Sequence, residues 1–259
     1  MYSRVFLCLA FVLVTTMASF SAGAADAKSV MQKSRDLRRG FTNSVADVEM
    51  SLSTGGKTVA RAMRQYVLEV SGDGNRTINV FSKPADVDGV SVLTHSALNG
   101  QDKQWLFLPS IGRVKRISTS NRSGAFVGSE FAYEDLSSFE VEKYAYDSVS
   151  DGKLDGRDVL IVEYRPTYSN SGYTRLRSFL DPSNYQPLRI EYFNRRGEHF
   201  KTLTLSDYRD YRGGSAWRAH LLVMDNLTNG NSTKIRFSKF KPSSSSTADF
   251  NPNRFSDVR

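Results

Sequence analysis

The feature that most constrains the fold is an alternation of apolar and polar residues that recurs along most of the chain. In residues 44–54, Ala46, Val48, Met50 and Leu52 alternate with Val45, Asp47, Glu49 and Ser51. A period of two predicts a β-strand with one apolar, buried face and one solvent-exposed face. Short turn signals such as Asn229-Gly230 separate these segments and predict hairpins between consecutive strands. We therefore expect a mainly β protein of about eleven antiparallel strands.

A meander of this length must curl into a barrel or a sandwich, because a flat sheet would leave its apolar face in water. Three segments depart from the alternation. Residues 26–39 are predicted to form a helix that Asp26 caps and Gly40 ends. Residues 121–139 are expected to form a loop with helical turns, and the serine-rich residues 241–247 read as a linker before a short tail.

The N-terminus has the pattern of a secretory signal peptide. An apolar run follows Arg4, and small residues follow it up to Ala25. This pattern predicts cleavage near residue 25, although an uncleaved membrane anchor is an alternative for which the apolar run is short. We expect residues 1–25 to be the signal peptide and residues 26–259 to form a single domain in the periplasm.

The chain offers little chemistry for catalysis. Its single cysteine, Cys8, lies in the predicted signal peptide, so the mature chain has no thiol for disulfides, catalysis or metal binding. His95, His199 and His220 have no metal-ligand spacing. The sequence also lacks a nucleophile elbow. We therefore predict a protein that is not an enzyme and that needs neither a metal nor a cofactor.

The chain carries an excess of positive charge. The formal charge of +8 falls to about +7 when Arg4 leaves with the signal peptide. For an exported protein the available polyanions are anionic lipid head groups and envelope polymers rather than nucleic acid. The alternative is that the excess cations are simply solvated.

The centre of the chain carries a distinctive motif. The run QWLFLPSIGRVKRIS is followed by GAFVGSEFAYEDL, so that an apolar strand, three cations and an aromatic-acidic segment lie close together. These residues resemble the signature of the outer-membrane lipoprotein-sorting protein family, in a LolA-like branch. The matching positions are Trp105, Leu106, Leu108, Pro109, Arg113, Arg116, Ile117, Phe126, Gly128, Ser129, Phe131, Tyr133, Glu134 and Asp135, and Lys201 matches a lysine in a later hairpin. Phe107 and Glu130 replace the usual Tyr and Asp.

The resemblance implies a half-open antiparallel β-barrel with a helical lid over an apolar cavity, as in LolA and LolB. It also implies a periplasmic carrier or chaperone that binds lipid or lipoprotein acyl chains and shuttles them between the inner and outer membranes. Members of this branch are often associated with transporters of the RND superfamily, including MMPL-type exporters, and a monomer is expected. The alternative function is a periplasmic sensor that binds lipoproteins and docks a signalling protein.

This interpretation assigns candidate residues to the cavity and to its rim. The cavity and lid are expected to include Val48, Met50, Trp105, Phe107, Phe126, Phe131, Tyr133 and Leu136. Plain core packing is the alternative role for these side chains. The rim is expected to include Arg113, Lys115 and Arg116. These cations could contact head groups or a partner, pair with Glu130, Glu134 and Asp135, or remain solvated.

Overall fold

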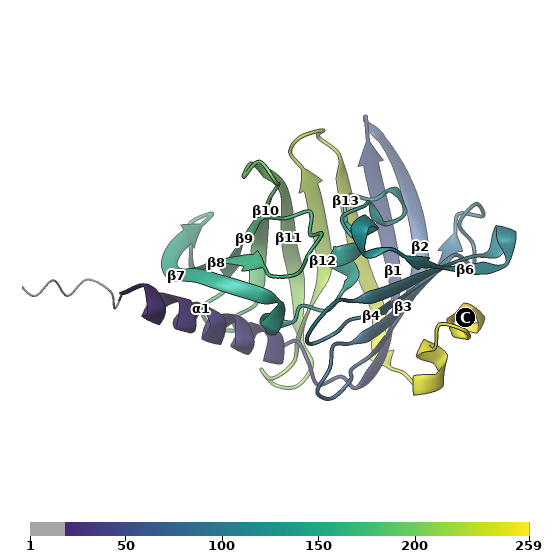
Figure 1. Ribbon diagram of the computed structural model, residues 1–259, viewed down its shortest axis with the longest axis horizontal. Helices are drawn as coiled ribbons and strands as arrows, with labels where there is room; N and C mark the ends of the chain where they lie inside the picture. The colour runs from purple at the N-terminus through teal and green to yellow at the C-terminus, as the bar shows by residue number, and fades with distance from the viewer. Residues whose placement is uncertain (1–18, 259) are drawn as a thin grey trace, which may run out of the picture.

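The computed structural model describes residues 19–258, which form one strongly bent antiparallel sheet, one α-helix and several short 3₁₀ turns (Figure 1). Most of the predicted signal peptide lies outside the described residues. The sheet has thirteen strands rather than about eleven. They are β1 Asn43–Thr54, β2 Lys57–Leu68, β3 Arg76–Lys83, β4 Ser91–His95, β5 Lys103–Leu108, β6 Arg113–Ile117, β7 Tyr144–Leu154, β8 Arg157–Pro166, β9 Arg175–Leu180, β10 Pro187–Phe193, β11 His199–Asp210, β12 Trp217–Asn226 and β13 Ser232–Pro242.

The strand order decides where the rest of the chain must go. The spatial order is β6-β5-β4-β3-β2-β1-β13-β12-β11-β10-β9-β8-β7, so two meanders meet where β1 pairs with β13. The consecutive strands β6 and β7 therefore lie at opposite ends of the sheet. Residues 118–143, which we call the insert, connect these two ends and run across the concave side of the curled sheet (Figure 1).

The helix α1 is longer at its start and shorter at its end than predicted. It spans Ser19–Asp36, so Asp26 lies inside the helix and does not cap it. The preceding small residues, Ala22, Gly23, Ala24 and Ala25, include three alanines, which have the highest helix propensity. The helix packs against β7. In residues 19–258, no helix has the length and apolar character needed to cross a membrane.

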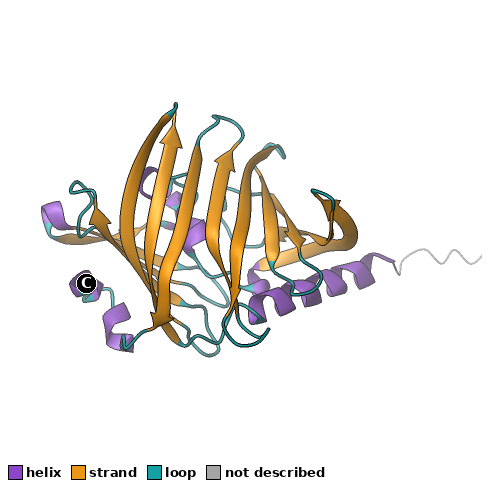
Figure 2. Ribbon diagram, turned by 180° about the vertical axis from the view of Figure 1, so that it is seen from behind, coloured by secondary structure: helices purple, strands orange, loops and turns teal. Residues whose placement is uncertain are grey.

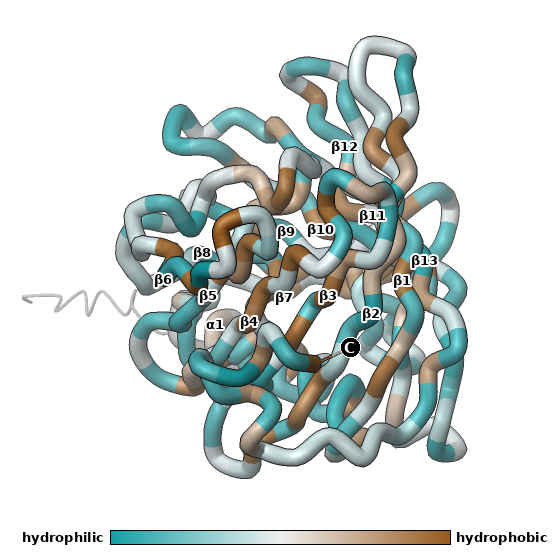
Figure 3. The backbone as a smooth tube through the Cα atoms, turned by 90° about the vertical axis from the view of Figure 1, so that its right-hand side faces the viewer, coloured by the Kyte–Doolittle hydropathy of each residue, from teal (hydrophilic) through white to brown (hydrophobic). Residues whose placement is uncertain are grey.

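The concave face carries the main hydrophobic core. Residues that alternate along every long strand point to this side and pack with the insert and with Ala27 and Met31 of α1. Their convex-side neighbours are largely polar along β11 and β13, which explains the clean alternation there. A third, smaller cluster of Leu154, Val159 and Phe179 lies among β7, β8 and β9. The hydropathy colouring of Figure 3 shows apolar positions along the strands and polar turns at the sheet edges.

A second core lies on the convex face of β2 to β5. Phe250 and Phe255 of the C-terminal segment, residues 243–258, are fully buried there against Tyr66, Ile78 and Leu93. Figure 2 shows this segment beside the outer face of the sheet. The predicted tail is therefore an integral part of the fold, and β3 and β4 are buried on both faces.

We expect the Phe255→Ala variant to lose about 3–5 kcal/mol of unfolding free energy, because a fully buried ring leaves a cavity when it is removed. Urea unfolding followed by circular dichroism measures this loss. The exposed neighbour Arg254 provides the control variant Arg254→Ala. Equal stability of the two variants would show that the C-terminal segment does not contribute to the core.

Candidate functional site

The insert fills a large part of the concave face with aromatic side chains. Phe126 and Phe131 are 1% and 3% exposed, and Tyr133 is also buried. The Phe126 ring centroid lies 5.8 Å from that of Phe81 on β3 and 5.8 Å from that of Tyr133. The predicted cavity residues of the insert therefore pack against the sheet. Val48 and Met50 of β1 belong to the same hydrophobic cluster, and the partly buried Leu136 packs against it.

The prediction that Trp105 and Phe107 line the cavity is wrong. Both side chains pack in the second core, under the C-terminal segment, while Leu106 and Leu108 face the concave core. The alternation along β5 separated these two pairs correctly, but both faces of β5 are covered. Hydrophobicity alone therefore could not show which pair faces inward.

The acidic residues of the central motif anchor the insert to the sheet. Asn226 Nδ2 donates to the Glu130 carboxylate at 2.7 Å, and Lys201 Nζ donates to the Glu130 carbonyl oxygen at 2.6 Å. Thr233 Oγ1 accepts a hydrogen bond from the Glu130 amide at 2.9 Å. Arg61 on β2 also donates to the Val127 carbonyl oxygen. These contacts join the insert to strands from both halves of the sheet.

Glu134 and Asp135 fasten the other side of the insert to the β8–β9 connection. Glu134 accepts hydrogen bonds from Tyr168 Oη at 3.0 Å, Ser171 Oγ at 2.8 Å and the Gly172 amide at 2.8 Å. Tyr173 Oη donates to the Asp135 carboxylate at 2.9 Å. The acidic pair is therefore used for internal hydrogen bonding.

Both ends of the insert share one buried carboxylate that sequence reasoning missed. Asp102 forms ion pairs with Arg122, at 2.9 Å, and with Lys143. All three side chains are buried. The three residues are 20 or more positions apart, so no local pattern could have revealed the cluster.

Burial changes the proton affinity of Asp135. Desolvation raises its pKa from 3.8 to about 7, and the neighbouring charge of Glu134 acts in the same direction. Hydrogen bonds from the Ala132 amide and Tyr173 oppose the shift without cancelling it. The carboxyl group that holds the insert therefore changes charge near neutral pH.

The three rim cations do not pair with the acids of the insert. Arg113, Lys115 and Arg116 are exposed on the edge strand β6, and within residues 19–258 they form no ion pair. Their register places Arg113 and Lys115 opposite Leu108 and Leu106, whereas Arg116 lies opposite Trp105, so the trio is divided between the two faces. The apolar side chains of Ile111 and Val114 in the same hairpin are 48% and 39% exposed.

Part of the concave face, on β10 to β13, is only partly buried. Four apolar side chains on the neighbouring strands β10 to β13 pack at the edge of the main core but stay partly exposed: Ile190, Leu205, Leu222 and Phe237. We call these residues the uncovered strip. Leu205 lies directly opposite Leu222 in the β11–β12 register, so the strip is continuous across these two strands. Sequence reasoning missed the strip, although the alternation in β11 carries part of the signal.

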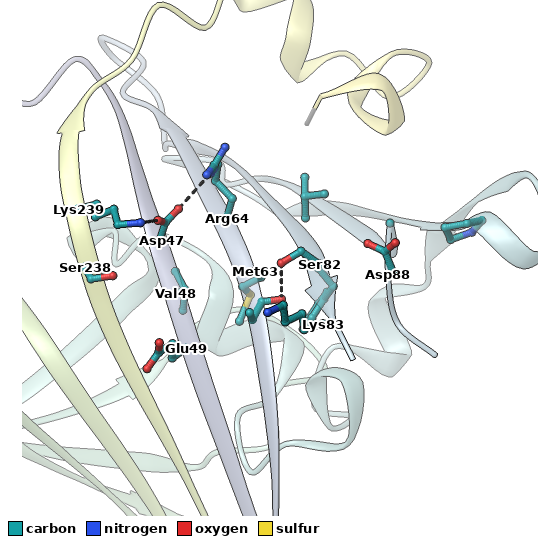
Figure 4. A pocket seen from close by; sticks show the side chains of 15 residues that line it. Asp47, Val48, Glu49, Met63, Arg64, Ser82, Lys83, Asp88, Ser238 and Lys239 are labelled. Carbon is teal, nitrogen blue, oxygen red and sulfur yellow. Dashed lines mark hydrogen bonds and ion pairs between the residues drawn. The ribbon is translucent and has the colours of Figure 1, made fainter. Parts of the chain in front are cut away.

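A groove of about 910 Å³ lies near β1, β2 and β3 (Figure 4). Its lining includes Val80, which belongs to the second core, and Asp47, which forms ion pairs with Arg64 at 3.1 Å and Lys239 at 3.0 Å. Charged side chains share this lining with apolar ones, among them Val48, Met63 and Phe81 of the main core, so the groove has a mixed character. The uncovered strip is a second candidate surface for an apolar ligand, on the concave face.

A bent antiparallel sheet with a separate segment laid across its apolar concave side is the architecture of LolA-like half-barrels. A solved structure of an outer membrane lipoprotein-sorting protein domain from Vibrio parahaemolyticus is 43% identical to this chain, with a TM-score of 0.86. The alignment covers 89% of this chain and 98% of the other.

Two further structures and a family model agree with this similarity. A DUF1329 family protein from Desulfovibrio piger is 25% identical, with a TM-score of 0.80 over 91% of this chain and 98% of the other. A LolA superfamily protein from Nitrosomonas europaea is 18% identical, with a TM-score of 0.69 over 87% of this chain and 97% of the other, and shows the fold alone. A family model described as "-like: Uncharacterized protein" matches residues 73–257. No curated protein matches the chain.

The chain therefore belongs to the family of outer membrane lipoprotein-sorting proteins, and its fold is LolA-like. This confirms the family resemblance of the central motif and the predicted half-open barrel.

We expect Asp102→Asn to reduce stability by about 3–5 kcal/mol, because it leaves two buried cations without a carboxylate. Thermal and urea unfolding measure the effect. Asp158→Asn is the matched control: it breaks an exposed pair with Lys153 and is expected to change stability by less than about 1 kcal/mol. A loss at Asp102 no larger than the control's would argue against the anchoring role.

Asp135 gives a prediction for the pH dependence of stability. The pKa of Asp135 is higher in the folded than in the unfolded protein, so the folded state binds the proton more tightly. The resulting contribution to the free energy of unfolding is fully present below about pH 4 and is lost as the pH rises through about 7. Asp135→Asn removes the titration, so the stability gap between wild type and variant should change by roughly 2–4 kcal/mol across this range. Urea unfolding at several pH values measures the gap, and parallel profiles would contradict the shifted pKa.

Proposed function

We propose that this protein is a periplasmic carrier that binds acyl chains of lipids or lipoproteins on its concave face and shuttles them between the inner and outer membranes. The observation that carries the proposal is the uncovered strip of Ile190, Leu205, Leu222 and Phe237, whose apolar side chains pack at the edge of the main core and are only partly buried. Membership of a lipoprotein-sorting family supports the same assignment. Binding and transport need no catalytic group.

The energetics of lipid transfer favour such a carrier. Each buried CH₂ group contributes about 0.8 kcal/mol, so a long acyl chain resists transfer into water by roughly 10 kcal/mol. A concave apolar face removes much of this barrier while the cargo crosses the periplasm. The strip offers side chains from neighbouring strands, and Leu205 and Leu222 directly oppose one another.

The insert is suited to act as a movable cover. It contains only short 3₁₀ turns and the isolated bridge between Ala125 and Ala132, so no strand ladder ties it to the sheet. Side-chain hydrogen bonds and ion pairs hold it instead, at Asp102, Glu130, Glu134 and Asp135. Displacement of the insert would expose the rest of the concave core to an acyl chain.

The β5–β6 hairpin supplies a contact surface for the carrier. Its exposed cations Arg113, Lys115 and Arg116 would meet anionic head groups or an acidic partner surface. The expected partner is an inner-membrane transporter of the RND or MMPL type, which would hand over the cargo. We further propose that the signal peptide directs export and is removed, and that the mature protein acts as a monomer.

Extraction of the purified protein with organic solvent, followed by mass spectrometry, tests the proposal directly. We expect acyl lipids to be recovered with the protein from an envelope extract, and the protein to take up the fluorescent fatty acid parinaric acid. Failure of both measurements would contradict the carrier function.

A reversible disulfide tests movement of the insert. The Glu130 amide lies 2.9 Å from Thr233 Oγ1, so the Glu130→Cys, Thr233→Cys pair should be close enough to form a disulfide. We expect oxidation to lower the uptake rate of parinaric acid at least about tenfold, and reduction to restore it.

The pair Ser53→Cys, Thr58→Cys serves as the control for the disulfide, because its side-chain oxygens are 3.2 Å apart in the β1–β2 hairpin, away from the insert. Unchanged uptake by the oxidised insert pair would show that the cover need not move.

A further inference from the structure

The β5–β6 hairpin forms the end of the sheet that lies away from α1. The strand β6 is the last strand on one side of the sheet order, and α1 packs against β7 on the other side (Figure 1). Every residue from 109 to 116 is exposed. The outer half of this hairpin is therefore free to contact another surface.

The turn at the tip of the hairpin is held by its own backbone. Pro109 begins a short 3₁₀ turn, and the Gly112 amide donates a hydrogen bond to the Pro109 carbonyl oxygen at 3.1 Å. Gly112 has a φ of 59°, which glycine adopts without the steric cost that other residues incur. The turn therefore presents the exposed side chain of Ile111 at the tip in a defined position.

The hairpin carries positive charge without a neighbouring acid in the sequence. From residue 103 to residue 129 there is no aspartate or glutamate, whereas β6 carries Arg113, Lys115 and Arg116. Within the part of the chain that the structure describes, these three cations form no ion pair. Their charges are therefore available to an external anionic partner.

The cations lie on both faces of the hairpin behind its tip. Arg113 lies opposite Leu108 and shares the concave side with Lys115, whereas Arg116 lies opposite Trp105, on the convex side. A strand rises about 3.3 Å per residue, so the three cations occupy roughly the first 10 Å of β6. The exposed Val114 lies among them.

This arrangement fits a bilayer surface better than a protein surface. Segments that bind at a membrane interface place apolar side chains about 5–10 Å into the boundary between head groups and acyl chains, and place cations at the head groups. A protein partner would contact one face of the hairpin and leave the cations of the other face unpaired. A bilayer that the tip enters end-on surrounds the hairpin and offers phosphates to both faces.

We propose that the β5–β6 hairpin docks the protein on an anionic bilayer, with Ile111 and Val114 in the interface and Arg113, Lys115 and Arg116 on lipid phosphates. This inference rests on the proposed carrier function and names the surface through which the carrier meets a membrane. Leu106 and Leu108 of the same hairpin pack against the main core, so docking brings one end of the concave face to the membrane.

Flotation with vesicles tests the role of the cations. We expect the exported protein to bind vesicles of phosphatidylcholine mixed with phosphatidylglycerol at least about tenfold more tightly than vesicles of pure phosphatidylcholine. Added salt should weaken this binding. The triple variant Arg113→Gln, Lys115→Gln, Arg116→Gln should bind on the order of 100-fold more weakly, since each cation near a membrane contributes about fivefold.

A second triple variant separates the hairpin from the net charge of the protein. Lys57, Lys234 and Arg236 are exposed cations on other strands, and they also form no ion pair within residues 19–258. Replacement of all three by Gln removes the same charge and should weaken binding by less than about threefold. Equal losses for the two triple variants would overturn the hairpin as the docking surface.

The apolar side chains are tested by Ile111→Ser combined with Val114→Ser, which should weaken vesicle binding by about tenfold. Val59→Ser combined with Leu227→Ser is the matched control, because these side chains are 49% and 55% exposed on other hairpins. Thermal unfolding of each variant checks that the fold is intact.

A single fluorophore reports on insertion of the tip. Cys8 lies in the predicted signal peptide, so the exported Ile111→Cys variant can be labelled at one position with NBD. We expect the NBD emission to rise and to shift to the blue on anionic vesicles, and lipids with a quencher in the acyl chain should reduce it. The same label on Leu227→Cys should show neither change.

The outcomes for docking and for the carrier function can be told apart. Failure of the wild-type protein to bind anionic vesicles would overturn docking on a bilayer and would favour an acidic protein as the partner. Vesicle binding that the hairpin variants retain in full would also overturn the proposal. In both cases, uptake of parinaric acid by the wild-type protein would leave the carrier function standing. Vesicle binding through the hairpin without any uptake would overturn the carrier function alone.

Discussion

The pairing of β1 with β13 is the constraint on which the rest of the structure depends. It joins two meanders into one sheet and sends β6 and β7, which follow each other in the chain, to its opposite ends. The insert must then cross the open side of the curled sheet to connect them. The position of the cover over the concave face is thus a consequence of strand order, and the aromatic residues of the central motif are delivered there by topology.

The acids and aromatics of the insert have complementary roles. Phe126, Phe131 and Tyr133 provide the apolar surface that fits the sheet, and Glu130, Glu134 and Asp135 provide directional contacts that fix its position. Hydrophobic burial is non-directional, whereas hydrogen bonds between fixed donors and acceptors define one arrangement. These two complementary roles explain why aromatic and acidic residues lie so close together in the segment FVGSEFAYEDL.

Periodicity and the family motif predicted the strands, the half-open barrel and the irregular insert, because these depend on local alternation and on a recognisable signature. They did not predict which face of β5 turns inward, because the C-terminal Phe250 and Phe255 cover the other face and make both apolar. The Asp102 cluster also escaped prediction. It brings together residues from three separate parts of the chain, and the charge pattern along the sequence carries no information about such long-range contacts.

The attachment of the insert at both ends has a consequence for ligand release under the proposed carrier function. Because the Phe126 and Phe131 rings are tethered beside the surface they cover, they are present there at a high effective concentration. An acyl chain bound in their place would compete with rings that stay attached to the protein. The return of the rings after release would then disfavour rebinding of the chain.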